Sequence, residues 1–120
     1  MTELLLVGSG SFIGGIFRYI CALLLKNSQI NFPVATFTVN IFGGLLIGFF
    51  YALSVKNSIS HSSMLFFTTG FCGGLTTFST FSKESFEFMQ NGQIGLGILY
   101  VVASVFISIF AVFCGCYFAK

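Results

Sequence analysis

The segment 70–81, GFCGGLTTFSTF, places hydroxyl and phenyl side chains in the middle of an apolar stretch. Phe78 and Phe81 are three residues apart, so a helix presents both rings on one face. The edge of a phenyl ring is electropositive and can meet an anion without holding it as tightly as a full charge does. The pair therefore predicts a weak anion contact, and the alternative is that both rings simply face lipid.

Two further groups of polar residues interrupt apolar stretches. Asn40 carries two N–H donors and one acceptor, so it either holds a neighbouring helix or offers donors to an anion. Tyr100, Ser104 and Ser108 recur at four-residue steps and form one helical stripe. Their hydroxyls either replace water around a small ion along a pathway or bond back to helix carbonyls.

Arg18 is the one charged residue placed well inside an apolar stretch. Two accounts fit it. In one, the guanidinium serves an anionic vestibule or satisfies backbone carbonyls. In the other, the long side chain extends to the membrane surface and has no further role.

The remaining chemistry argues against an enzyme. The sequence has no aspartate, a single histidine (His61, expected in a loop) and three glutamates expected at or beyond helix ends. A carboxylate pair, a catalytic triad and a two-histidine metal site are therefore not expected. The four cysteines lack the spacing of a zinc site, and a net charge of +2 is too small and scattered to predict a nucleic-acid partner.

The composition predicts an integral membrane protein that forms one domain over residues 1–120. Hydrophobic residues make up 56% of the chain and charged residues only 7%, far below the share in soluble domains. Four apolar stretches, 4–25, 33–55, 64–82 and 94–118, are each long enough to cross a bilayer as a helix. The expected fold is all-α with four transmembrane helices joined by short polar loops.

The third of these helices, expected over 62–90, is predicted to be broken near 72–77. Gly73 and Gly74 in succession weaken helix propensity, and the threonines and Ser79 that follow can satisfy the carbonyls that a break releases. The start of this helix is expected to be capped by Ser62 or Ser63.

The loop charges bear on orientation, because basic residues normally mark the cytoplasmic side. Lys56 and Lys120 lie at one end of the expected bundle, and Lys26, Lys83 and the deeper Arg18 lie at the other. With so slight a bias, the sequence predicts that the chain inserts in both directions. The alternative is that one basic residue decides the orientation.

Taken together, these features resemble the Fluc family, also called CrcB, of small bacterial fluoride channels. The resemblance covers nearly the whole chain and rests on three segments, GSGSFIGGIFRY, ATFTVNIFG and GGLTTFSTFSKE. The chain departs from the family pattern at Ser11, Gly15 and Ala35, and each keeps a small side chain.

The resemblance implies a four-helix subunit that pairs with a second copy as an antiparallel homodimer with two ion pathways in the bacterial inner membrane. By motif position, Phe78 and Phe81 would contact fluoride, and Asn40 would be the pore asparagine. Tyr100, Ser104 and Ser108 would form the polar track, with the run around Ser79 as pore wall. A structural Na⁺ would bind the backbone carbonyls of Gly73 and Thr76 at the dimer centre.

Two other classes of membrane protein fit the sequence less well. A small multidrug exporter has a similar length and helix number, but it needs an acidic residue within the first helix, and Glu3 lies at the extreme N-terminus. A non-transporting scaffold subunit leaves the break, the phenylalanine pair and the hydroxyl stripe unused.

Overall fold

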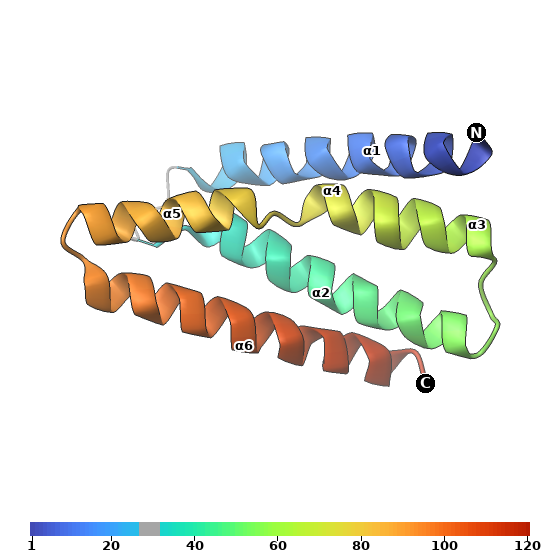
Figure 1. Cartoon of the computed structure of the whole chain (residues 1–120). Helices are drawn as coiled ribbons and strands as arrows, with labels where there is room; N and C mark the ends of the chain where they lie inside the picture. Colours follow the sequence, from blue (N-terminus) through green and yellow to red (C-terminus); the bar gives the residue numbers. More distant parts are fainter. Residues whose placement is uncertain (27–31) are drawn as a thin grey trace.

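The computed structural model describes residues 1–26 and 32–120, and every regular element in these ranges is a helix (Figure 1). Within the described ranges, three helices are long and apolar enough to cross a membrane: α1 (Thr2–Leu25), α2 (Val34–Val55) and α6 (Ile94–Phe118). These findings confirm an all-α fold with the character of a membrane protein.

The segment between α2 and α6 is not one uniform helix. It begins as α3 (His61–Met64), continues as the π-helix η1 (Leu65–Cys72) and ends its first half as α4 (Gly73–Leu75). A second half, α5 (Ser79–Gln90), follows after an interruption. The two halves follow the same general direction, and the non-helical connection between α4 and α5 is visible in Figure 1.

The interruption occupies Thr76, Thr77 and Phe78, so it overlaps the end of the predicted break near 72–77 but lies after the two glycines expected to cause it. Gly73 has ordinary right-handed helical angles (φ −62°, ψ −37°), whereas Thr76 is extended (ψ 156°). Gly74 has a different function, because a Cβ atom there would collide with the backbone of Ser11 on α1. This glycine therefore permits close helix packing and does not itself break the helix.

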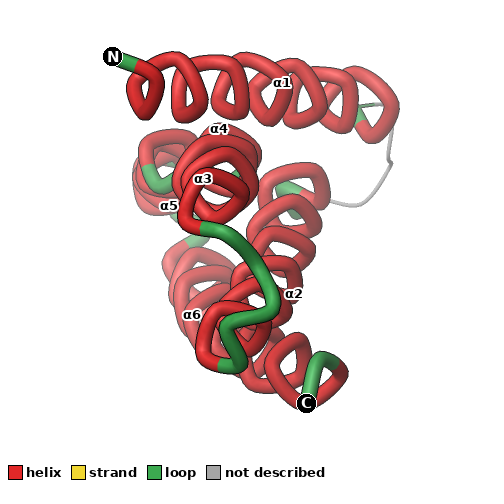
Figure 2. Tube along the Cα trace, turned by 90° about the vertical axis from the view of Figure 1, so that its right-hand side faces the viewer, coloured by secondary structure: helices red, strands yellow, loops and turns green. Residues whose placement is uncertain are grey.

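The helices form two closely packed groups (Figure 2). α2 packs mainly against α6, and α1 packs mainly against η1 and α4. The described structure measures 48 × 29 × 21 Å along its principal axes, with the helix axes along its length.

Glycines make both contacts possible. On α1, Gly10 and Gly14 are buried against the backbone of η1 and α4. On α2, a Cβ atom at Gly44 would lie 2.9 Å from the carbonyl oxygen of Ser108, and one at Gly48 would collide with the backbone at Val112. Small residues let helix backbones approach in a membrane, where dispersion contacts replace the hydrophobic effect between helices.

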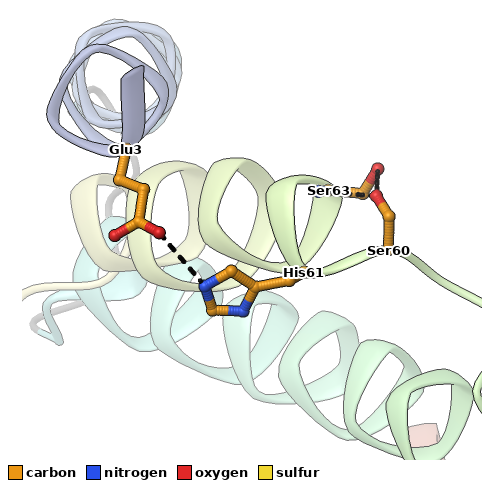
Figure 3. Close-up of polar contacts among 4 residues, drawn as sticks. All are labelled: Glu3, Ser60, His61 and Ser63. Carbon is orange, nitrogen blue, oxygen red and sulfur yellow. Dashed lines mark hydrogen bonds and ion pairs between the residues drawn. The ribbon is translucent and has the colours of Figure 1, made fainter. Parts of the chain in front are cut away.

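The N-terminus of α3 is capped by Ser60, not by Ser62 or Ser63 as expected (Figure 3). The Ser60 hydroxyl oxygen accepts a hydrogen bond from the backbone N–H of Ser63 at 3.1 Å. His61 is the first residue of α3, and its Nε2 lies 3.6 Å from Oε1 of Glu3 in the first turn of α1. Both side chains are largely exposed, so this contact ties the two helix ends together only weakly.

Candidate functional site

A groove of about 380 Å³ lies where α2, the interruption and α6 meet. It is lined by Asn40, Gly44, Ile47, Thr76, Thr77, Phe78, Phe81, Ser104, Val105, Ser108, Ile109 and Val112. The structure thus brings together five of the residues predicted from the sequence, namely Asn40, Phe78, Phe81, Ser104 and Ser108. None of these lining side chains is charged, so any ion in the groove meets only dipoles and apolar walls.

Asn40 pairs with the interrupted backbone through both ends of its amide. Its Oδ1 accepts a hydrogen bond from the Thr77 N–H at 2.9 Å, and its Nδ2 donates to the Thr77 carbonyl at 3.2 Å. In an uninterrupted helix the Thr77 N–H would bond to the carbonyl of Gly73. Asn40 therefore replaces a helix partner and holds the interruption open, while the second hydrogen on Nδ2 is left for the groove.

Ser104 presents a buried hydroxyl to the same groove. The residue is only 5% exposed, and its Oγ has no hydrogen-bond partner among the described residues. A buried polar atom without a partner costs free energy, so it marks a place where water or a ligand completes the hydrogen bonding. Ser108 lies one turn further along α6 and also lines the groove.

The aromatic residues form a connected series from the groove toward α6. The ring centroids of Phe78 and Phe81 are 5.8 Å apart, and those of Phe81 and Tyr100 are 5.1 Å apart. Phe78 is 79% exposed in a single chain, whereas Tyr100 is fully buried.

Tyr100 does not line the groove, although it belongs to the predicted stripe with Ser104 and Ser108. Its hydroxyl donates a hydrogen bond to Oε1 of Glu84 at 3.0 Å. Glu84 was not predicted from the sequence, because all three glutamates were expected at or beyond helix ends. The signal was present, since Glu84 and Tyr100 are equally distant in sequence from the turn at Gly92 and therefore meet across the α5–α6 hairpin.

Ser79 lies at the start of α5, is exposed and is not part of the groove lining. Its Oγ lies 3.3 Å from Oγ1 of Thr77, and that same Oγ1 accepts a hydrogen bond from the Thr80 N–H at 3.2 Å. Thr77 thus caps α5 with its side chain while Asn40 binds its backbone. The sequence analysis did not single out this double role.

Two carbonyls at the interruption are left without donors. Among the described residues, nothing donates a hydrogen bond to the carbonyl oxygens of Gly73 and Thr76, the pair predicted to bind a cation. The Thr76 side chain is turned away, because its hydroxyl donates to the Cys72 carbonyl at 2.8 Å. Uncharged carbonyl oxygens of this kind suit a monovalent cation such as Na⁺, so the residues present fit the predicted ion.

Arg18, on α1, is not among the residues that line the groove. Its Nε donates a hydrogen bond to the Gly74 carbonyl at 3.0 Å, and the side chain is partly buried. Of the accounts left open by the sequence, this contact favours the one in which Arg18 satisfies a backbone carbonyl.

The apolar helices, the interrupted third segment and the charge-free groove together define a multi-pass membrane protein. A family model described as "CrcB-like protein, Camphor Resistance (CrcB)" matches residues 5–116. The chain therefore belongs to the CrcB-like family, as its motifs predicted.

Relatives with established names support the same assignment. A fluoride-specific ion channel FluC of Flavobacterium psychrophilum is 40% identical over 122 residues, which cover 100% of this chain and 98% of the relative. Proteins of the same name from Chlorobaculum tepidum and Clostridium perfringens are 42% and 44% identical, and the matches cover 96% and 88% of their lengths. Membership of this family is consistent with a place in the bacterial inner membrane.

Proposed function

We propose that this protein is a fluoride-selective channel that lets fluoride leave the bacterial cell passively and so confers resistance to fluoride. The observation that carries the proposal is the groove, which combines a free N–H of Asn40, the partnerless hydroxyl of Ser104 and the exposed ring of Phe78. The naming of the full-length relatives as fluoride-specific ion channels supports the same conclusion.

The absence of charge from the groove lining suits the conduction of a small, strongly hydrated anion. Fluoride gives up water on entering a narrow passage, so donors must replace that water. A fixed positive charge there would bind the ion too tightly to release it, whereas several weak, neutral sites allow both entry and exit. Asn40, Ser104 and Ser108 supply neutral donors, and the phenylalanine edges supply weak positive potential.

A second copy of the chain completes the pathway in this proposal. The groove is open in one subunit, and Phe78 is 79% exposed beside the interruption. Irregular backbone at membrane depth is stable only where protein or a water-filled cavity covers it. The near-equal charges at the two ends of the bundle favour an antiparallel copy, with α3 to α5 acting together as a fourth membrane-crossing segment in each subunit.

A structural Na⁺ at the centre of this dimer would bind the free carbonyls of Gly73 and Thr76 from both copies. When bound, the ion would neutralise carbonyl dipoles that otherwise repel one another across the dimer axis. Gly73 is exposed, and a Cβ atom there would have no neighbour within 4 Å in its own chain. Its lack of a side chain therefore leaves room for the second copy.

Fluoride efflux from liposomes that contain the purified protein tests the proposal. With a fluoride electrode and a parallel chloride electrode, we expect rapid release of fluoride and little release of chloride. Protein that is folded and dimeric but releases no fluoride would contradict the channel function while leaving family membership intact.

A further inference from the structure

We infer that Arg18 is a positioning residue that holds the broken third segment in register through the Gly74 carbonyl, and that its Nε–H donor, not its charge, is what this task requires. The inference deepens the proposed function, on which it rests for its consequence for conduction. The contact itself, Arg18 Nε to Gly74 O at 3.0 Å, stands independently of that function.

The Gly74 carbonyl needs such a donor because of the interruption. In a continuous helix it would accept a hydrogen bond from the N–H of Phe78, four residues later. The chain becomes extended at Thr76, and no backbone group among the described residues donates to the Gly74 oxygen in its place. Leaving this half-buried carbonyl unpaired inside the membrane would be costly, since no bulk water is available there.

α1 is well placed to supply the donor. A Cβ atom at Gly74 would collide with the Ser11 backbone, so α1 and α4 touch at this level. Ser11 itself donates a hydrogen bond from its Oγ to the Gly70 carbonyl at 3.2 Å. Ser11 and Arg18 lie seven residues apart on one face of α1, and their two hydrogen bonds fasten successive turns of the broken segment to that helix.

The interruption is thus held from two sides. Asn40 on α2 binds both backbone groups of Thr77, and Arg18 on α1 binds the carbonyl of Gly74. The free carbonyl of Thr76 lies between these two anchors, and that of Gly73 comes directly before the Gly74 anchor. If the Arg18 hydrogen bond were lost, only Asn40 on α2 would fix the orientation of these carbonyls.

The position of the donating atom allows the hydrogen bond and the charge to be tested separately. Glutamine carries its Nε2 at the same distance along the side chain as the Nε of arginine, so Arg18→Gln keeps a donor there and removes the charge. Arg18→Lys keeps the charge but moves the nitrogen one atom further out. Arg18→Met places a methyl group about as far along the side chain as the Nε of arginine, and it offers neither the N–H donor nor the charge.

Amide hydrogen exchange in the full-length protein, reconstituted in lipid nanodiscs, measures the anchor directly. For peptides covering 73–80 we expect Arg18→Met to exchange about tenfold faster than the parent, as loss of one hydrogen bond predicts, and Arg18→Gln to exchange as the parent does. Lys26→Met removes an exposed charge beyond the end of α1 and should leave these peptides unchanged. Slow exchange in Arg18→Met, or fast exchange in Arg18→Gln with parent-like Arg18→Lys, would overturn the inference.

Should Arg18→Met not insert stably, the comparison of the glutamine and lysine variants decides the matter alone. Fluoride and chloride efflux of the same samples then tests the consequence, with Arg18→Gln expected to remain selective and Arg18→Met to lose fluoride efflux. A parent protein that conducts no fluoride would refute the proposed function but leave the exchange result valid, so the two failures are distinguishable.

Discussion

At the scale of single residues, the groove depends on which polar groups the fold has already used. Asn40 uses its acceptor oxygen and one N–H in hydrogen bonds to Thr77, and the Tyr100 hydroxyl donates to Glu84. The Ser104 hydroxyl has no hydrogen-bond partner within the described chain. The packing role and the ion-binding role that were alternatives for Asn40 are therefore compatible in one side chain. The hydroxyl stripe, by contrast, divides into a buried structural tyrosine and two serines that line the groove.

Replacing either phenylalanine of the pair by isoleucine tests the aromatic contact. Phe78→Ile and Phe81→Ile keep most of the bulk but remove the electropositive ring edge, so we expect fluoride efflux to fall about tenfold, equivalent to about 1.4 kcal/mol in the barrier. Liposome efflux measures the effect, and size-exclusion chromatography checks that each variant elutes as the parent does. The matched control is Phe86→Ile on α5, because Phe86 is exposed and lies outside the groove. Equal efflux in all three variants would rule out a ring-edge contact.

Asn40→Leu removes both hydrogen bonds to Thr77 at nearly constant volume. It leaves an N–H and a carbonyl unpaired, and each such group costs about 1–3 kcal/mol. We expect a lower thermal unfolding temperature together with impaired fluoride efflux. Thr38→Val, an exposed position on the same helix, should change neither. Destabilisation with normal efflux would assign Asn40 a purely structural role.

At the scale of elements, close helix contacts and the interruption have different causes. Glycine at 10, 14, 44 and 48 lets backbones touch, and Gly74 does the same at the very place where the sequence suggested a broken helix. The helix actually ends where Asn40 supplies a competing acceptor for Thr77 and the Thr76 hydroxyl bonds back to Cys72. The interruption is therefore imposed by a neighbouring helix and not by local flexibility alone.

Alanine substitutions at two glycines separate these effects. Gly48→Ala forces a methyl group against the backbone of α6 at Val112, so it should destabilise the fold by about 1–3 kcal/mol, the usual cost of overpacking. Gly15→Ala on α1 has no neighbour within 4 Å and should be neutral or slightly stabilising, because alanine favours helix. Thermal unfolding in detergent measures both. Equal effects at the two positions would mean that the α2–α6 contact is looser than described.

At the scale of the whole molecule, the groove of a single chain is open to its surroundings. Phe78, which lines the groove, is uncovered, while most of the remaining helix surface is apolar as lipid requires. The even distribution of lysines between the two ends gives no strong preference for one orientation. These features belong together if two copies insert in opposite directions and cover each other's grooves.

Labelling from one side of the membrane tests this arrangement. Ser58→Cys, in the exposed turn after α2, is introduced into a chain whose four native cysteines are replaced by serine or alanine. In intact cells, a membrane-impermeant maleimide should label about half of the molecules, as equal insertion in both directions requires. Adding Ser62→Lys near this cysteine should keep the turn on the cytoplasmic side, so the labelled fraction of molecules should fall toward zero. Complete or absent labelling of the first variant would contradict dual topology.

The sequence by itself determined the class of protein, the helical segments 4–25, 33–55 and 94–118 to within a residue or two, and the family. These follow from composition, apolar length and local motifs, all of which are properties of neighbouring residues. The tertiary structure alone decided that the interruption falls at Thr76–Phe78, that Tyr100 bonds to Glu84 and that Arg18 reaches Gly74. Each of these depends on a donor or acceptor from another helix, and the partner of a polar group across a helix interface is set by packing that no local pattern specifies.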